Sequence, residues 1–305
     1  MSFFHANTFW GFPMNLRKYE AFASVISLGS LTRAAEALGC TQSAVSHMIN
    51  SLENELGFRL LIRSRHGVKL TADGEKALPA VLAVLDANER LEQIVSSIHG
   101  LDAGVVRIGA FTSVAVHWLP GMIKGFQKMH PNIEFRLNNG DYHDVEQWLL
   151  RDECDLGFVT LPNELSCDCV ELVDDPLLAI IPNTHPLAEA DVFPIRRIEQ
   201  EDFISLLETS SHDARRVFKS AGVTPNVKFK TKDDYAIIAM VENGLGVSIM
   251  PQLLLKNRSE NVTVLPLDQP FKRTIALATS ETGADSPAVK AFAEYVQQWV
   301  KEQQK

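Results

Sequence analysis

The residues best suited to chemistry lie on one face of a helix predicted over residues 42–56. At about 100° per residue, the apolar side chains of this segment gather on the opposite face, where they can anchor the helix in a core. The free face carries short side chains that donate and accept hydrogen bonds. Such a face suits contact with base edges in the major groove of DNA. The candidate base-contacting residues are Thr41, Gln42, Ser43, Ser46 and His47, with Asn50 further along.

A shorter helix precedes this one, and the segment Leu38-Gly39-Cys40 separates the two. The small side chains of Ala34 and Ala35 allow close packing of helices, and Gly39 can adopt the turn conformation. Thr41 can cap the second helix. An earlier helix, predicted over residues 16–27, would complete a three-helix core. The pattern indicates a helix-turn-helix, although an ordinary pair of antiparallel helices gives a similar local signal.

A basic hairpin is predicted directly after these helices, over residues 59–70 with Gly67 in its turn. Its cations would lie on the phosphate backbone as a wing, which supplies salt-dependent affinity without reading the base sequence. A solvated basic loop is the alternative for an isolated run of charges. The position directly after a helix-turn-helix favours the wing. The residues concerned are Arg63, Arg65, His66 and Lys69.

Residues 14–75 resemble the N-terminal domain of LysR-type transcriptional regulators. The resemblance rests on the pattern A-A-x-x-L-x-x-[ST]-Q-S-A-V-S, followed by L-E-x-x-L-G and R-x-x-x-x-x-x-L-T-x-x-G. The chain departs from the family at Leu61, where Phe is frequent, and at His47, where a basic or amide side chain is frequent. The first is a change within the core, and the second bears on the base preference.

The resemblance implies a sequence-specific regulator of transcription that binds double-stranded DNA. It also implies control by a small-molecule effector and assembly as a homodimer or a homotetramer built as a dimer of dimers. RNA polymerase would be a further partner. No cofactor and no membrane association are expected, and the expected location is the cytoplasm.

A long helix is predicted from the cap residue Thr71 to about Ile98. Its apolar positions alternate in steps of four and three, which is the spacing of a coiled-coil seam. One seam position holds Asn88 instead of an apolar residue. The resemblance assigns this helix to a dimer interface, and packing against the chain's own C-terminal domain is the alternative. The residues expected in the interface are Val81, Val84, Asn88, Leu91 and Val95.

From Val105 onward, strand and helix patterns alternate, which is typical of an α/β domain. One of the predicted helices begins at Thr112 and ends near His130. The pattern predicts two α/β lobes joined by two crossings of the chain, a fold that resembles the periplasmic binding proteins. The expected parts are a disordered extension (1–13), a winged helix-turn-helix (14–71), a linker helix (72–100) and an effector domain (104–305) with lobes at 104–161 plus 268–305 and at 162–267.

Hydroxyl side chains follow strand ends that should face the crevice between these lobes. Hydroxyls and free N–H groups at helix starts can bind an anion, so an effector with a carboxylate or another anionic group is expected. Each hydroxyl taken alone is equally consistent with a plain helix cap. The candidate ligand-binding residues are Thr112, Ser113, Thr160, Thr209 and Ser210.

Cys167 and Cys169 leave open a thiol-based, redox-responsive regulator as an alternative. Their spacing matches neither a C-x-x-C site nor a tetrahedral zinc set, so no metal site is expected. No constellation of catalytic residues stands out, and the chain is not expected to be an enzyme. A cytosolic solute-binding protein built on the same α/β lobes is a further, weaker alternative.

The charge of the chain is distributed unevenly. Over residues 14–71 there are seven basic and four acidic residues, a net of +3, which leaves −12 for the rest of a chain whose total is −9. A basic module on an acidic body is typical of a specific DNA-binding protein. Residues 1–13 contain no Lys or Arg and lack the pattern of a signal peptide, so Met14 is a candidate natural start.

Overall fold

The computed structural model describes the chain from residue 15 to residue 303. The predicted disordered extension over residues 1–13 lies outside the described residues. The chain divides into two compact units, residues 1–92 and 93–305. Within the described ranges, the helices are all too short or too polar to cross a membrane. The gaps in the description are residues 65–66, 99–102, 164, 166, 208–212 and 257–261.

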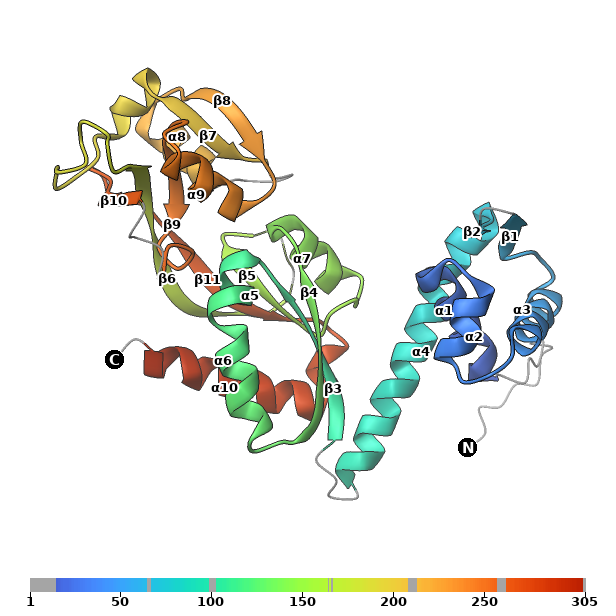
Figure 1. Ribbon diagram of the computed structural model, residues 1–305. Coiled ribbons are helices and arrows are strands. Elements are labelled where there is room, and N and C mark those ends of the chain that lie inside the picture. The colour runs from blue at the N-terminus through green and yellow to red at the C-terminus, as the bar shows by residue number, and fades with distance from the viewer. Residues whose placement is uncertain are drawn as a thin grey trace. The chain divides into compact units, whose positions relative to one another are not determined.

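Three helices open unit 1, and each of them begins at a side-chain cap. The side chains of Asn15, Ser30 and Thr41 accept N–H groups of the first turns, which confirms the predicted cap at Thr41. Gly29 and Gly57 end two of the helices in the left-handed conformation, with φ of 66° and 80°. The elements of the unit are α1 (Leu16–Leu28), α2 (Leu31–Ala37), α3 (Gln42–Leu56), β1 (Leu61–Ser64), β2 (Gly67–Leu70) and most of α4 (Ala72–Ile98), which continues past the boundary at residue 92 (Figure 1).

The core of unit 1 collects apolar side chains from α1, α2, α3 and the first part of α4. Phe22, Ile49 and Leu52 are fully buried there. The apolar face of α3 therefore points inward, as its periodicity predicts. Val81 of α4 belongs to the same core and is 5% exposed. This corrects the prediction that Val81 contacts a second copy, because its side chain is already packed within its own unit.

The wing is a two-stranded antiparallel hairpin of β1 and β2, and its base is joined closely to α4. Thr71 donates a hydrogen bond to the carbonyl of Arg59 at 2.6 Å and accepts the N–H of Gly74 at 2.9 Å. It thus caps α4, as predicted, and ties the helix to the wing. A Cβ at residue 74 would lie 2.2 Å from the carbonyl oxygen of Leu60, so only glycine fits there.

Unit 2 is built around a seven-stranded sheet with the order β10-β6-β11-β5-β3-β4, in which β9 also pairs with β6. The first half of β6 pairs with β11, and the second half pairs with β9 and β10. This strand therefore belongs to both lobes (Figure 1). The strands of the sheet are β3 (Ala103–Ala110), β4 (Asn132–Asn139), β5 (Leu156–Leu161), β6 (Cys169–Pro182), β9 (Ser248–Pro251), β10 (Val262–Pro266) and β11 (Lys272–Thr279).

Helices cover both faces of the sheet in the first lobe. Along β5, Phe158 joins the cluster that contains α6 and α10, while its neighbour Val159 joins the cluster that contains α7. Alternate residues of a strand point to opposite faces, so the two clusters form two separate layers of core. Figure 1 shows α6 and α10 together and α7 apart from them. These helices are α5 (Thr112–His117), α6 (Leu119–Gln127), α7 (Tyr142–Leu150) and α10 (Pro287–Gln303).

The second lobe repeats this layered arrangement. The side chains of α8 pack in one cluster with Ile181, and those of α9 pack in another with Ile180. The neighbouring residues of β6 therefore serve opposite faces here as well. The winged helix-turn-helix followed by a two-lobed α/β domain confirms the predicted fold class. The remaining elements are η1 (Ile195–Gln200), β7 (Asp202–Leu206), α8 (Asp213–Ala221), β8 (Asn226–Thr231), α9 (Asp234–Glu242) and η2 (Gly283–Asp285).

The single helix predicted from Thr112 to near His130 is instead two helices, α5 and α6. Trp118 lies between them with φ −113° and ψ −54°. Pro120 occupies the first turn of α6. A proline lacks an N–H group and its ring clashes with the carbonyl of the residue four positions earlier, so a continuous helix cannot pass through it without a kink. As a result, α5 is only six residues long.

Candidate nucleic-acid interface and ligand cavity

The free face of α3 carries the residues predicted to contact base edges. Gln42, Ser43 and His47 are exposed, and Ser46 is half-buried. Thr41 is also exposed, but its hydroxyl accepts a first-turn N–H and lies 2.9 Å from Ser43 Oγ. Its structural role is therefore the helix cap. Contact of these five side chains with DNA stays a prediction.

A buried carboxylate joins the wing to α3. Glu53 is 4% exposed, and its Oε1 accepts the N–H groups of Leu60 at 2.8 Å and Leu61 at 3.1 Å. Its Oε2 accepts a hydrogen bond from Arg59 at 2.8 Å. Burial alone would raise the pKa of Glu53, but the two N–H donors and Arg59 outweigh burial and lower this pKa below its usual value. The start of β1 is thus held by an ionised group.

Arg63 of the wing bonds to the free face of α3. The Nη1 atom of Arg63 donates to Ser46 Oγ at 2.8 Å, and its Nη2 atom donates to Asn50 Oδ1 at 2.9 Å. The guanidinium therefore lies beside the predicted reading face. Lys69 is exposed on β2. The two other predicted wing contacts, which lie outside the described residues, are Arg65 and His66.

A cavity of about 300 Å³ lies between the two lobes of unit 2. One wall comes from the starts of α5 and α7 in the first lobe. The other wall comes from β7, β9 and the starts of α8 and α9 in the second lobe. Both polar and apolar side chains line it, which is typical of a small-molecule site. The charged residues that line the cavity are Asp141, Asp144, Asp213, Lys232, Asp234 and Arg273.

Arg273 is a buried residue of the cavity lining with several hydrogen-bond partners. It is 2% exposed, and its Nη2 and Nε atoms donate to Asp175 Oδ2 at 2.6 Å and 2.9 Å. Nη2 also donates to Ser113 Oγ at 2.7 Å, and Nη1 donates to the hydroxyl of Tyr142. Arg273 on β11 lies directly opposite Asp175 on β6, so this pair joins the two strands that cross between the lobes.

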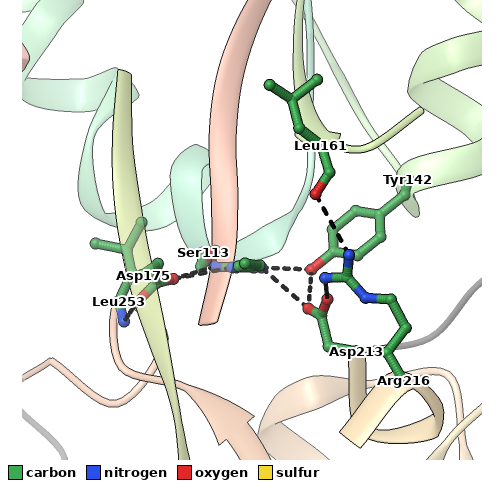
Figure 2. Close-up of polar contacts among 8 residues, drawn as sticks. Ser113, Tyr142, Leu161, Asp175, Asp213, Arg216 and Leu253 are labelled. Atoms are coloured by element: carbon green, nitrogen blue, oxygen red, sulfur yellow. Dashed lines mark hydrogen bonds and ion pairs between the residues drawn. The ribbon is translucent and has the colours of Figure 1, made fainter. Parts of the chain in front are cut away.

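Further hydrogen bonds connect the lobes across the cavity (Figure 2). The hydroxyl of Tyr142 donates to Asp213 Oδ2 at 2.7 Å. Arg216 donates to Asp213 Oδ1 at 2.7 Å and to the carbonyl of Leu161 at 3.3 Å. Tyr142 and Leu161 belong to the first lobe, whereas Asp213 and Arg216 belong to the second. The lobes are therefore linked by side chains as well as by the crossing strands.

The hydroxyls predicted to bind an anion have other partners. Thr112 hydrogen-bonds to Asp234, and Ser113 accepts a bond from Arg273. Thr160 is buried within β5 and does not line the cavity, which corrects its predicted role. The other two predicted ligand-binding residues, Thr209 and Ser210, lie outside the described residues.

Two charged residues of the cavity, Lys232 and Asp234, are not part of the ion pair between Arg273 and Asp175. Within the described ranges, Lys232 has no carboxylate partner and is exposed at the rim. Burial is the largest influence on Asp234 and raises its pKa, while the hydrogen bond to Thr112 and the charge of Arg273 act in the opposite direction. A ligand that donates a hydrogen bond or brings positive charge would lower this pKa.

Several residues that build these sites were not singled out by the sequence reasoning. For two of them a signal exists, because each is a polar residue at a position where its strand or helix should face a core. Glu53 stands within the apolar face of α3, and Arg273 lies shortly before the apolar run 275–278 of β11. The hydrogen-bond partners in the cavity gave no such signal, because each lies far along the chain from the residue that it contacts. These partners are Tyr142, Asp175 and Asp213.

The predicted dimer seam on α4 is apolar and exposed in its second half. Leu91 is 58% exposed, Ile94 38% and Val95 43%. Val84 and Asn88 are half-buried, and the amide of Asn88 donates to Glu92 on the next turn at 3.0 Å. Exposed apolar stripes of this kind mark interaction surfaces. The contact itself stays a prediction.

Two of the thiols, those of Cys154 and Cys167, have environments that do not favour reactivity. Burial raises the pKa of Cys154 to about 12. Burial, and next the neighbouring Cys169, raise the pKa of Cys167 to about 11. Because the thiolate is the reactive form, both cysteines are almost entirely protonated near neutral pH. The redox alternative therefore gains no support from this geometry.

Comparison with known proteins identifies the family. Residues 16–75 match the family described as bacterial regulatory helix-turn-helix protein, lysR family, and residues 99–301 match the LysR substrate binding domain. The chain belongs to the LysR family. It is a transcriptional regulator with an N-terminal helix-turn-helix domain and a C-terminal effector-binding domain, which confirms the resemblance seen in the sequence.

Two similar proteins span both domains, and a third matches through its effector binding domain alone. The probable HTH-type transcriptional regulator LrrA of Synechococcus elongatus is 31% identical over 93% of this chain and 97% of its own length. Full-length CbnR, in a complex with its target DNA, has a TM-score of 0.72 at 20% identity, over 93% of this chain and 99% of CbnR. The effector binding domain of QuiR, in complex with shikimate, has a TM-score of 0.59 at 25% identity, over 66% of this chain and 98% of QuiR.

Proposed function

We propose that α3 reads base edges through Gln42, Ser43, Ser46 and His47, and that Lys69 of the wing contacts phosphate. The observation that carries this proposal is the division of α3 into one buried apolar face and one free polar face. The protein would act in the cytoplasm as a regulator and not as an enzyme. Contact with RNA polymerase stays a prediction.

The test compares two amide residues at opposite ends of the same helix. Gln42→Ala should weaken operator binding by about 1–3 kcal/mol and relax the preference at one base position. Asn54→Ala, also exposed on α3, is the matched control and should leave both unchanged. Mobility-shift titrations with the promoter next to the protein's own gene measure the effect. Equal affinities for the wild type and a folded Gln42→Ala protein would contradict the assignment.

We also propose that the effector occupies the cavity between the lobes and carries an anionic group. The residue best placed for that group is Lys232, because it is a cation of the cavity lining, whereas Arg273 is paired with Asp175 and the hydroxyl of Thr112 bonds to Asp234. The hydroxyl of Ser113 accepts a bond from Arg273 and keeps its proton as a donor. Donor groups of the effector would face Asp234. Hydroxylated carboxylates combine these features, and shikimate, seen with QuiR, is a suitable first probe.

The test uses three probes that share a six-membered carbon ring, namely shikimate, cyclohexanecarboxylate and cyclohexylamine. The two carboxylates should raise the melting temperature of the full chain, with shikimate giving the larger shift. Lys232→Ala should remove these shifts, whereas Lys230→Ala, an exposed lysine outside the cavity, should keep them. Stabilisation by the amine alone would contradict the proposed anionic class. Equal shifts in both variants would contradict the site.

We propose finally that the exposed stripe on α4 pairs with the same stripe of a second copy. Leu91→Glu should convert the dimer into monomers, which light scattering coupled to size exclusion measures. Leu150→Glu on α7 is a matched control, because Leu150 is 59% exposed and Leu91 is 58% exposed. Dissociation by both variants, or by neither, would contradict the assignment of the interface to α4.

A further inference from the structure

Arg63 connects two residues of α3 that are one helical turn apart. Ser46 and Asn50 occupy positions i and i+4, which places their side chains beside each other on the helix surface. The planar guanidinium offers several N–H donors in a fixed fork. One arm of that fork donates to Ser46 Oγ at 2.8 Å, and the other donates to Asn50 Oδ1 at 2.9 Å. Both acceptors lie at the predicted reading face.

The backbone that carries Arg63 is itself fixed to α3. Glu53 accepts the N–H groups of Leu60 and Leu61 at the entry to β1. Arg63 follows two residues later on the same strand. Strand and helix are therefore joined twice, once by a buried carboxylate and once by an exposed guanidinium. This leaves little freedom for Arg63 to move away from α3 on its own.

The contact decides what the two α3 side chains can offer to DNA. With Ser46 Oγ accepting from Arg63, the hydroxyl proton of Ser46 remains as a donor. With Asn50 Oδ1 accepting from Arg63, the amide N–H groups of Asn50 remain as donors. An Asn that recognises adenine needs its oxygen for the adenine amino group and its N–H for N7. Such a two-point contact is disfavoured while the oxygen is engaged.

We propose that Arg63 is a positioning residue for base readout, which holds Ser46 and Asn50 as donors toward acceptor-bearing base edges. Purine N7, guanine O6 and thymine O4 are the acceptors in the major groove. This inference rests on the proposed reading role of α3. It differs from the sequence-based expectation that Arg63 contributes only a phosphate contact, which would add affinity without sequence information.

The experiment selects binding sites from a random-sequence duplex library with the full chain, followed by sequencing of the bound pool. Arg63→Lys keeps the positive charge but cannot bridge two acceptors. It should relax the preference roughly tenfold at the base positions that Asn50→Ala also relaxes. The double variant should show no further loss, because both changes remove the same constraint. The salt dependence of binding should stay as in the wild type.

Lys69→Ala is the matched control for a phosphate contact. It should weaken binding to every sequence alike and flatten the salt dependence by about one unit of slope. If Arg63→Lys leaves all base preferences unchanged, or if Arg63→Ala behaves as Lys69→Ala does, the positioning role is overturned. Melting curves establish that each variant is folded, and Arg63→Met provides a second replacement of similar length.

The failure of this inference can be told apart from the failure of the proposed function. If Gln42→Ala relaxes a base preference while Arg63→Lys does not, α3 reads the sequence and only the positioning role is overturned. If neither Gln42→Ala nor Asn50→Ala alters any preference, the reading role of α3 fails and the inference fails with it.

Discussion

Replacement of Arg273 by Met should destabilise unit 2 strongly, because Arg273 is 2% exposed and its partner Asp175 is 4% exposed. The change removes the bonds of 2.6 Å and 2.9 Å to Asp175 and the bond of 2.7 Å to Ser113. It leaves a buried carboxylate with one remaining donor, the N–H of Leu253 at 2.9 Å. Breaking a buried ion pair by removing one partner costs about 3–5 kcal/mol.

A second substitution separates the charge effect from the loss of packing. Asp175→Asn keeps an oxygen that can accept the N–H of Leu253 and removes the uncompensated charge. The double variant Asp175→Asn/Arg273→Met should therefore recover much of the stability, because neutral replacements of a buried pair are often close to neutral in free energy. We expect it to lie within about 2 kcal/mol of the wild type.

Urea denaturation followed by tryptophan fluorescence measures these changes, because Trp118, Trp148 and Trp299 all lie in unit 2. For a unit of this size, a loss of about 3–5 kcal/mol corresponds to a fall in melting temperature of about 6–20 °C. Lys228→Met breaks the exposed ion pair with Asp202 and should cost less than about 1 kcal/mol. Equal effects of Arg273→Met and Lys228→Met would refute the reasoning, as would a double variant no more stable than Arg273→Met.

Three other predictions follow from the same contacts. Glu53→Gln should lower stability by about 1–3 kcal/mol at neutral pH, and urea titrations should show this difference disappearing as the pH falls through the lowered pKa of Glu53. The Asp234→Asn protein should have a higher melting temperature than the wild type, and the difference should grow as the pH rises from about 4 through the raised pKa of Asp234. A difference that does not change with pH would contradict this. Asn88→Leu should raise the melting temperature of the dimer and weaken operator binding, because a polar seam residue fixes register at a cost in stability. No change in either quantity would indicate that Asn88 simply faces water beside Glu92.

Unit 1 was predictable because its signals are local. The cap at Thr41, the turn at Gly39 and the periodicity of α3 each lie within a few residues of the structure they specify. The main local error concerned the helix predicted to begin at Thr112. Its apolar pattern continues past Pro120, so periodicity alone did not indicate the break between α5 and α6.

The cavity could be predicted only in outline. Strand ends and helix starts do place Thr112 and Ser113 in its wall, as the alternating pattern indicated. The partners of these hydroxyls were not predictable, since Ser113 and Arg273 are 160 positions apart in the chain. A hydroxyl with no evident partner in the sequence can therefore have one in the fold. The pairing of Arg273 with Asp175 depends on the register of β11 against β6. A single amino-acid sequence does not reveal this register.

The buried charges of both units lie where one element must be held in a single register against another. A slip of β11 by one residue against β6 would remove Asp175 from its place opposite Arg273 and leave both charges buried without a partner. The pair therefore penalises every other register of the strands that the two lobes share. Glu53 acts in the same way in unit 1, because any shift of β1 would leave its carboxylate without the N–H groups of Leu60 and Leu61. Apolar residues in place of the Arg273–Asp175 pair or of Glu53 could stabilise the core equally well, but they would not penalise a change of register. A shift of β11 against β6 would move the cavity walls, and a shift of β1 against α3 would move Arg63.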